Sequence, residues 1–452
     1  MWRRRLGGRR KTGCHLVLLG GLFVLFTGLV VAMRLVNRDP VLILPEDREA
    51  LAVQCPGPGE NSLTRIVEAQ SLLPAETPEP LLVPQPGRKD RMIPYRAERG
   101  SLARSLNIER PDDDPEFLAY LEQCEPVLRQ CLDLLAHPCF PFPVNATSLG
   151  RWRQRPSQII PWGFLLAVAA AKGRYRGQPA EAASLLADII RLTRLADAPN
   201  GLLNLATHIE QRALEELRRI ARGLDSEAEL EGLQRLVGSL EPAYPDRQEL
   251  LKSEWRIVDN TLLAPPTPEP DTIERRIEIH VLLWQLQRAA KFTAKHKDSL
   301  LDLVERPLTE VSRWVQDHRQ EVYRRHRVFN PYWSVNQVVR EVARVNSAYY
   351  ATILAILLER YQRANGAYPE SLDALCPDYL PRLPTDPIAN APFLYRRDRS
   401  FYVLYSLGED GIDQKGNSRK DHVLVSNEDA ETVNSSPPQN LPARRRVRRS
   451  RN

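Results

Sequence analysis

The chain has 452 residues, of which 42% are hydrophobic and 27% charged, and this balance excludes a chain that is disordered throughout. Its formal net charge of +6 arises at the two ends: residues 1–12 and residues 441–452 each hold six Lys or Arg and no acidic residue. The part between them therefore carries a net charge of −6, which argues against a nucleic-acid-binding face on the body.

Twenty uncharged residues run from Cys14 to Met33, directly after the basic segment 1–12. About 20 apolar residues are needed to cross a hydrocarbon core, and a secretory signal has a shorter apolar region of about 7–15 residues. The sequence therefore predicts an uncleaved transmembrane helix over residues 13–36. The arginines before it place the N-terminus in the cytoplasm and the bulk of the chain on the other side of the membrane.

Residues 37–112 are rich in proline and poor in periodic apolar pattern, which predicts a juxtamembrane spacer. A helical domain is expected over residues 113–328. It begins at Asp112–Asp114, where an aspartate followed by Pro115 is typical of a helix N-cap rather than of a metal or acid–base cluster.

Within this domain, apolar residues recur at helical spacing in several segments separated by short breaks. Short breaks favour antiparallel neighbours, so we expect an α-hairpin array, an architecture that commonly binds protein partners along a groove. The expected helices lie in segments 177–198, 200–224, Ser226–Leu240, Asp246–Asp259, Ile273–His296 and Ser299–His326.

Five cysteines follow the predicted span, and an oxidising compartment would allow at most two bridges among this odd number. Cys131 and Cys139 form one candidate pair, but unpaired cysteines are an equal alternative, and the pairing stays open. The sequence has no C-x-x-C zinc or redox motif. The five residues are Cys55, Cys124, Cys131, Cys139 and Cys376.

The sequence contains no HExxH, no G-x-S-x-G and no phosphate-binding glycine loop, so it favours a protein that is not an enzyme. His208 and Glu210 match half of a deaminase signature, but the cysteine pair of that signature is absent. The alternative is an envelope hydrolase whose site lies between helices. Its candidate carboxylates are Asp112–Asp114, Glu210, Glu215 and Glu216.

A second folded unit is expected over residues 329–427. One amphipathic helix is predicted from Ser334 to Ala364, and Asn365-Gly366 ends it. A short turn, YPESLDAL, follows the helix. The runs FLYRR and FYVLYSL then predict a hairpin around residues 398–400, and HVLVS predicts a last strand. The expected unit is a long helix on a small antiparallel sheet.

Three ordered stretches, LLERYQRANGAYPESLDAL, YLPRLPTDPIANAPFLY and YVLYSLGEDG, resemble the C-terminal part of the major pseudopilin of type II secretion systems, the protein G family. The resemblance covers roughly residues 340–425 and implies a pseudopilin-like α+β domain in a protein of the bacterial inner membrane. Together with the preceding segments it gives a mainly α fold: a transmembrane helix, an α-hairpin array and this C-terminal domain.

The chain departs from that family in how its domain is attached. In the family the membrane helix continues into the domain, whereas here about 300 residues separate the two. The fifth residue after Gly13 is Leu18, where the family has a glutamate. A component of a secretion-like pseudopilus is therefore kept as an alternative that requires processing near residue 13.

In the pseudopilin family, the loop after the SLG strand binds calcium. Glycines in this loop let carbonyl and carboxylate oxygens converge, as calcium requires, but Lys415, Arg419 and Lys420 favour the alternative of a plain Asp/Gly turn. Carried over, the ligands that the resemblance implies are the carbonyl of Leu407 and the side chains of Asp410, Asp413 and Asp421, with Asn417 as a further candidate.

Residues 428–452 are predicted to be a disordered basic tail that either contacts anionic polymers or stays solvated. The sequence as a whole leads us to expect a single-pass protein of the bacterial inner membrane. We expect it to bind a protein partner through its helical region, in an envelope- or secretion-associated role without catalysis.

Overall fold

The structure, a computed structural model, is described over residues 41–45, 82–85, 88–94, 126, 177–197, 203–263, 273–318, 329–398, 401–407, 412–416 and 422–426. This part is mainly helical, with a small antiparallel sheet near the C-terminus, which confirms the coarse fold class. The predicted span 13–36 and both basic tails lie outside it. Among the helices that are described, none combines the length and the apolarity needed to cross a membrane.

The central element is α15 (Pro331–Asn365), a helix of 35 residues. Its start is fixed by Asn330, whose Oδ1 accepts hydrogen bonds from the backbone N–H groups of Tyr332 and Trp333 at 3.1 and 3.2 Å. It ends where Gly366 adopts a left-handed conformation, with φ of 76°. The predicted helix is thus confirmed, and it begins three residues earlier than the pattern indicated because Asn330 and the following proline form the cap.

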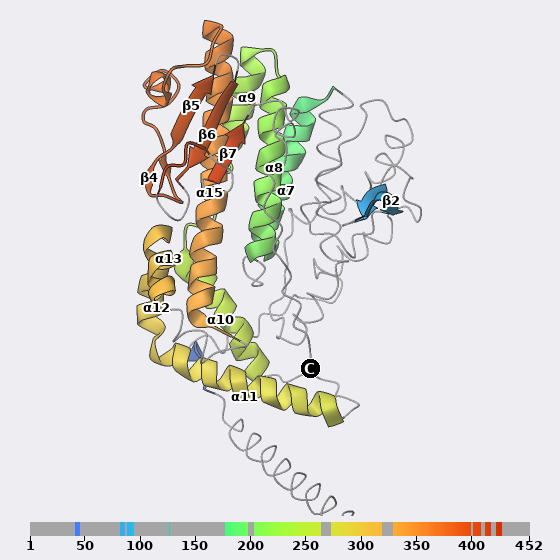
Figure 1. Cartoon of the computed structure of the whole chain (residues 1–452), viewed down its shortest axis with the longest axis vertical. Helices are drawn as coiled ribbons and strands as arrows, with labels where there is room; N and C mark the ends of the chain where they lie inside the picture. Colours follow the sequence, from blue (N-terminus) through green and yellow to red (C-terminus); the bar gives the residue numbers. More distant parts are fainter. Residues whose placement is uncertain are drawn as a thin grey trace, which may run out of the picture.

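Three strands make up the C-terminal sheet: β5 (Leu394–Asp398), β6 (Phe401–Ser406) and β7 (His422–Ser426). They are antiparallel and ordered β5-β6-β7, so the predicted hairpin and last strand are confirmed. The sheet covers the C-terminal half of α15 (Figure 1). The buried residues between them, which we call the sheet-side core, include Ala351, Leu354, Leu357, Leu358, Tyr368, Leu372, Phe393, Tyr402, Leu404 and Val425.

The segment between α15 and the sheet contains a short 3₁₀ helix, η6 (Leu372–Leu375), and two two-residue strands, β3 (Thr385–Asp386) and β4 (Ala391–Pro392). Asp386 is fully buried and accepts a hydrogen bond from the hydroxyl of Ser347 on α15. Its carboxylate also accepts the backbone N–H groups of Ile388 at 3.1 Å and Ala389 at 3.3 Å. One carboxylate therefore fixes both the local turn and its attachment to α15.

The helices before α15 largely follow the sequence prediction. Ser226, for example, caps one of them: its hydroxyl accepts from the N–H of Glu229, whose carboxylate reaches back to Ser226. The helices are α7 (Pro179–Asp197), α8 (Leu203–Gly223), α9 (Glu227–Gly238), α10 (Arg247–Leu263), α11 (Ile273–Lys295), α12 (Lys297–Val304) and α13 (Leu308–Asp317).

The single helix expected over Ser299–His326 is wrong. Instead, α12 ends at Val304 and α13 starts again after Pro307, which is its N-cap. A proline has no N–H to donate and its ring clashes with the preceding turn, so it begins a helix more readily than it continues one. The apolar periodicity ran through this break and concealed it.

These helices contact α15 along much of its length and from several sides (Figure 1). Helices α8 and α9 contact it, with α7 against both of them, and α10, α12 and α13 contact it as well. The N-terminal half of α15 thereby enters a second cluster, which we call the helical core. The helical core includes Ile43, Leu44, Trp255, Leu286, Leu300, Leu308, Val335, Val338 and Val342. The helix predicted for the C-terminal unit is thus also a central element of the preceding helical region.

Helices α8 and α15 run parallel and are joined by polar contacts at regular intervals. The hydroxyl of Thr207 donates to Glu341 at 3.0 Å, and Arg218 donates to the hydroxyl of Thr352 at 2.9 Å. Each pair is 134 residues apart in the chain. The two partners on α15 lie three helical turns apart and so face the same side.

The proline-rich segment 37–112 contains structure that the sequence pattern did not predict. Strands β1 (Leu82–Gln85) and β2 (Arg88–Pro94) form an antiparallel pair. The signal was present in the dipeptide Pro86-Gly87, which is typical of a turn. The structure also describes residues 41–45, which pack into the helical core through Ile43 and Leu44.

We expect Asp386→Ala to destabilise the protein by about 3 kcal/mol, since three donors lose a buried acceptor at about 1 kcal/mol each. Denaturant unfolding of the full chain in detergent measures this as a lower midpoint. The matched control is Asp378→Ala, an exposed aspartate of the same segment, which should leave the midpoint unchanged. Equal midpoints for the two variants would contradict the role of Asp386.

Candidate functional site

The most distinctive polar site joins α10 to the segment that follows the predicted membrane span. Asp259 of α10 is 1% exposed, and its carboxylate accepts two backbone N–H groups. Ile43 N lies 2.9 Å from Oδ1 and 3.1 Å from Oδ2, and Leu44 N lies 2.9 Å from Oδ2. We call this arrangement of Asp259, Ile43 and Leu44 the clamp.

The two apolar side chains of the clamp are also buried. Ile43 and Leu44 are each 1% exposed and belong to the helical core, beside residues such as Trp255 of α10 and Val335 of α15. Full burial of a side chain of this size contributes about 1.5–3 kcal/mol. The segment is therefore held by apolar packing and by hydrogen bonds from two backbone N–H groups to a buried side chain.

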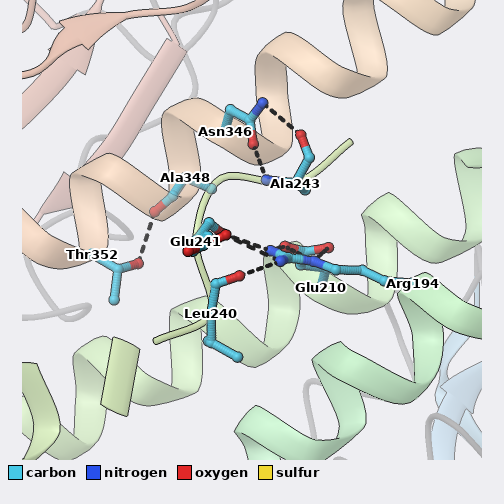
Figure 2. Close-up of polar contacts among 8 residues, drawn as sticks. All are labelled: Arg194, Glu210, Leu240, Glu241, Ala243, Asn346, Ala348 and Thr352. Atoms are coloured by element: carbon cyan, nitrogen blue, oxygen red, sulfur yellow. Dashed lines mark hydrogen bonds and ion pairs between the residues drawn. The ribbon is translucent and has the colours of Figure 1, made fainter. Parts of the chain in front are cut away.

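A second polar site holds the connection between α9 and α10 (Figure 2). The guanidinium of Arg194 on α7 pairs with Glu210 on α8, with Nε 3.2 and 3.1 Å from the two carboxylate oxygens. The same guanidinium donates to the carbonyl oxygens of Leu240 at 2.5 Å and Glu241 at 3.2 Å. A single arginine thus ties two helices to the loop that leaves α9.

Asn346 of α15 holds the same loop from its other side (Figure 2). Its Oδ1 accepts from Ala243 N at 2.6 Å, and its Nδ2 donates to Ala243 O at 2.9 Å. Glu241 and Tyr244 on either side have φ of 54°, a region that non-glycine residues rarely adopt. The strained loop conformation is therefore maintained by Arg194 and Asn346.

Burial shifts the pKa of two ionisable side chains on α8. Desolvation raises the pKa of Glu210 above its ordinary value, against the opposing effects of the hydrogen bond and the charge of Arg194. Desolvation likewise lowers the pKa of Arg218 to about 10. Arg218 donates to groups of α15, the hydroxyl of Thr352 and the carbonyl of Ala348. Glu210 thus links α8 to α7, and Arg218 links α8 to α15.

Among the described residues, those proposed for a hydrolase site do not converge. Glu210 is fully buried against Arg194, Glu215 pairs with Arg212 on its own helix, and Glu216 pairs with a neighbour one turn away. His208 lies on the exposed side of α8. The aspartates 112–114 lie outside the described residues. Each described carboxylate of this set is thus engaged in a separate ion pair.

The candidate calcium loop is described in part. Asp413 Oδ1 accepts from the hydroxyl of Tyr405 at 3.2 Å and from Lys415 N at 2.7 Å, as in an Asx turn. Leu407 follows β6 directly, whereas Asp410 and Asp421 lie outside the described residues. In the residues that can be searched, no three His, Cys, Asp or Glu side chains form a metal-binding group. Calcium binding here stays a prediction.

Cys376 is partly buried and forms no disulfide with another described residue. The remaining cysteines, including the candidate pair Cys131 and Cys139, lie outside the described part of the chain, so the disulfide pattern stays open.

Sequence reasoning did not single out Asp259 or the Ile43-Leu44 pair. A signal existed for each. Asp259 lies one turn from the C-terminal end of α10, where the helix dipole disfavours a negative charge, so its presence there calls for a donor. Ile43 and Leu44 belong to the apolar run VLIL, which stands out in the proline-rich segment.

Comparison with known proteins gives no relative: no protein-family model, no curated protein and no solved structure matches the chain. The functional interpretation therefore rests on the sequence and on the geometry above.

We expect Asp259→Ala to release the segment 41–45 from the helical core. A buried donor that loses its acceptor costs about 1–3 kcal/mol, so amide exchange at Ile43 and Leu44 should accelerate about 5- to 150-fold. Hydrogen-exchange mass spectrometry of the full chain in detergent measures this. Asp302→Ala, which removes an exposed aspartate on α12, is the control, and identical exchange in the two variants would contradict the clamp.

The raised pKa of Glu210 predicts a pH-dependent stability. The folded state holds this proton at pH values where the unfolded chain, with a pKa near 4.5, has lost it. Stability is therefore highest below pH 4.5 with respect to this group and falls as pH rises through the folded pKa, by at most about 1.4 kcal/mol per pH unit. Denaturation midpoints at a series of pH values test this. Glu210→Gln should flatten the slope, and Glu215→Gln should retain it.

Proposed function

We propose that this protein is a single-pass, non-enzymatic protein of the bacterial inner membrane that holds a partner-binding body close to the extracytoplasmic membrane surface. The observation that carries the proposal is the clamp. The segment that follows the apolar run Cys14–Met33 is inserted into the helical core and bonded to Asp259, so the body cannot move freely at the end of a long linker.

The length of chain before the clamp limits how far the body lies from the bilayer. Val41 follows Met33 by eight positions. Eight residues span at most about 26–29 Å when fully extended. A membrane anchor whose apolar run ends at Met33 would therefore keep Val41, at the clamp end of the body, within this distance of the end of that run.

The fold of the C-terminal unit supports the pseudopilin-like part of the proposal. The three stretches that carry the resemblance lie at structural junctions. Asn365-Gly366 ends α15, Asp386 attaches the following segment to α15, and Ser406 ends β6. The unit is built on α15, which the preceding helices also use, rather than on a membrane helix, and this favours a fixed envelope protein over a fibre subunit.

A binding role is favoured over catalysis because the described carboxylates of α8 are engaged in separate ion pairs and do not converge. We propose that the helical region binds a protein partner. Calcium at the loop of Leu407, Asp410, Asp413 and Asp421, and contacts of the tail 428–452 with anionic polymers, remain parts of the proposal that rest on the sequence.

Membrane extraction tests the proposed anchor. We expect the full chain to remain in the membrane fraction after alkaline carbonate and after high salt, since a helix of about 20 apolar residues is held by the bilayer core. A chain that lacks residues 1–36 should be released by either treatment. Release of the full chain by carbonate would contradict the anchor, and an intact mass that shows cleavage near residue 13 would favour the pseudopilus alternative.

A further inference from the structure

Helix α11 lies across the end of the molecule at which α15 begins and residues 41–45 are bound (Figure 1). Its inner face belongs to the helical core, where Leu286 and Ala290 lie in the same cluster as Ile43 and Leu44. The first turn of α15 also meets α11: the rings of Tyr332 and Phe292 have centroids 5.8 Å apart. The outer face of α11 is therefore the surface that this end of the body presents to its surroundings.

Four residues, Trp284, Arg288, Lys291 and Lys295, lie along the outer face of α11. They follow one another at spacings of four, three and four residues. These spacings place the side chains on one side of a helix, about opposite to the buried Leu286, Ala289 and Thr293. The three cationic members are exposed, and Trp284 is partly exposed. We call these four residues the α11 stripe.

The basic side chains of the α11 stripe have no acidic partner among the residues that the structure describes. Arg288 lies over the ring of Trp284, 5.0 Å from its centroid, a contact that leaves the cation available to an anion. Within the part of the chain that is described, Arg288, Lys291 and Lys295 form no ion pair. A cluster of three cations without ion pairs in the described structure is unexpected on a body whose net charge is −6.

A second aromatic side chain lies at the same end. Trp333, in the first turn of α15, is 49% exposed and is one of only three large hydrophobic residues of the described chain with high exposure. Val41, next to the clamp, is another at 39%. Tryptophan is enriched at the level of lipid headgroups because its ring is apolar and its N–H is polar. The exposed apolar groups and the free cations thus occur together around the clamp.

We propose that the α11 stripe docks on the membrane surface by binding the anionic headgroups of phospholipids. This inference rests on the proposed membrane anchor, since the anchor brings this end of the body within about 26–29 Å of the bilayer. Lipid phosphates are complementary to Arg288, Lys291 and Lys295, and Trp284 and Trp333 suit the headgroup region. Docking orients the body so that α15 points away from the membrane and presents the sheet and the α8–α9 end to partners.

Tryptophan quenching tests the docking directly. The full chain is reconstituted in vesicles that contain lipids with brominated acyl chains, with or without a fraction of phosphatidylglycerol. The difference in quenching between the wild type and Trp284→Phe isolates the signal of Trp284. We expect strong quenching of Trp284 in the anionic vesicles at low salt, and weaker quenching at high salt or in neutral vesicles.

The decisive variant reverses the stripe charges, Arg288→Glu, Lys291→Glu and Lys295→Glu. Each basic residue lost at an anionic surface should lower the ratio of docked to free body about fivefold. The matched control reverses three exposed arginines elsewhere, Arg235, Arg382 and Arg396, with the same change in net charge. Quenching of Trp284 should collapse in the first variant and persist in the second.

Carbonate extraction of the same vesicles separates the two proposals. If the chain is retained but Trp284 is not quenched in anionic vesicles, or if both triple variants behave alike, the docking is wrong and the anchor stands. If the chain is extracted by carbonate, the anchor itself is wrong. Quenching that is equally strong in neutral vesicles at high salt would overturn the role of the stripe charges.

Discussion

Helix α15 is the constraint on which the rest of the structure depends, because both cores are built on it. Its N-terminal half supplies Val335, Val338 and Val342 to the helical core, and its C-terminal half supplies Leu354 and Leu357 to the sheet-side core. A continuous helix cannot be divided between two independent bodies without breaking backbone hydrogen bonds. The region 177–263, the helices α11–α13 and the C-terminal sheet are therefore held to one element.

Buried and partly buried polar side chains determine how the segments attach to this framework. Asp386 fixes the turn after α15, Asn346 fixes the loop after α9, and Asp259 fixes the segment 41–45. Each accepts or exchanges hydrogen bonds with backbone groups that would otherwise be buried without partners. Apolar packing alone tolerates slippage, whereas such a bond is lost entirely when the register shifts. This is why a body assembled from distant segments has one arrangement.

Much of the fold could be predicted from the sequence, because helix periodicity, proline starts and the Asn365-Gly366 stop are local signals. The break at Pro307 was missed because apolar spacing continued across it. The candidate site was largely missed for a different reason. The clamp joins Asp259 to Leu44 and Ile43, which are separated from it by 215 and 216 positions in the chain, and a local sequence pattern does not reveal such a pairing. The α11 stripe was visible in the sequence as a periodicity, but its significance depends on α11 lying at the same end as the clamp.

In the proposed arrangement, the clamp end of the body faces the membrane and the far end of α15 faces away from it. Energy transfer from single dyes to labelled lipid headgroups measures this in the reconstituted full chain. One dye is placed at Trp333→Cys in the first turn of α15, and the other at Glu370→Cys, an exposed position just beyond the last residue of this helix, which is about 50 Å long. We expect strong transfer from position 333 and weak transfer from position 370, and equal transfer from both positions would contradict this orientation.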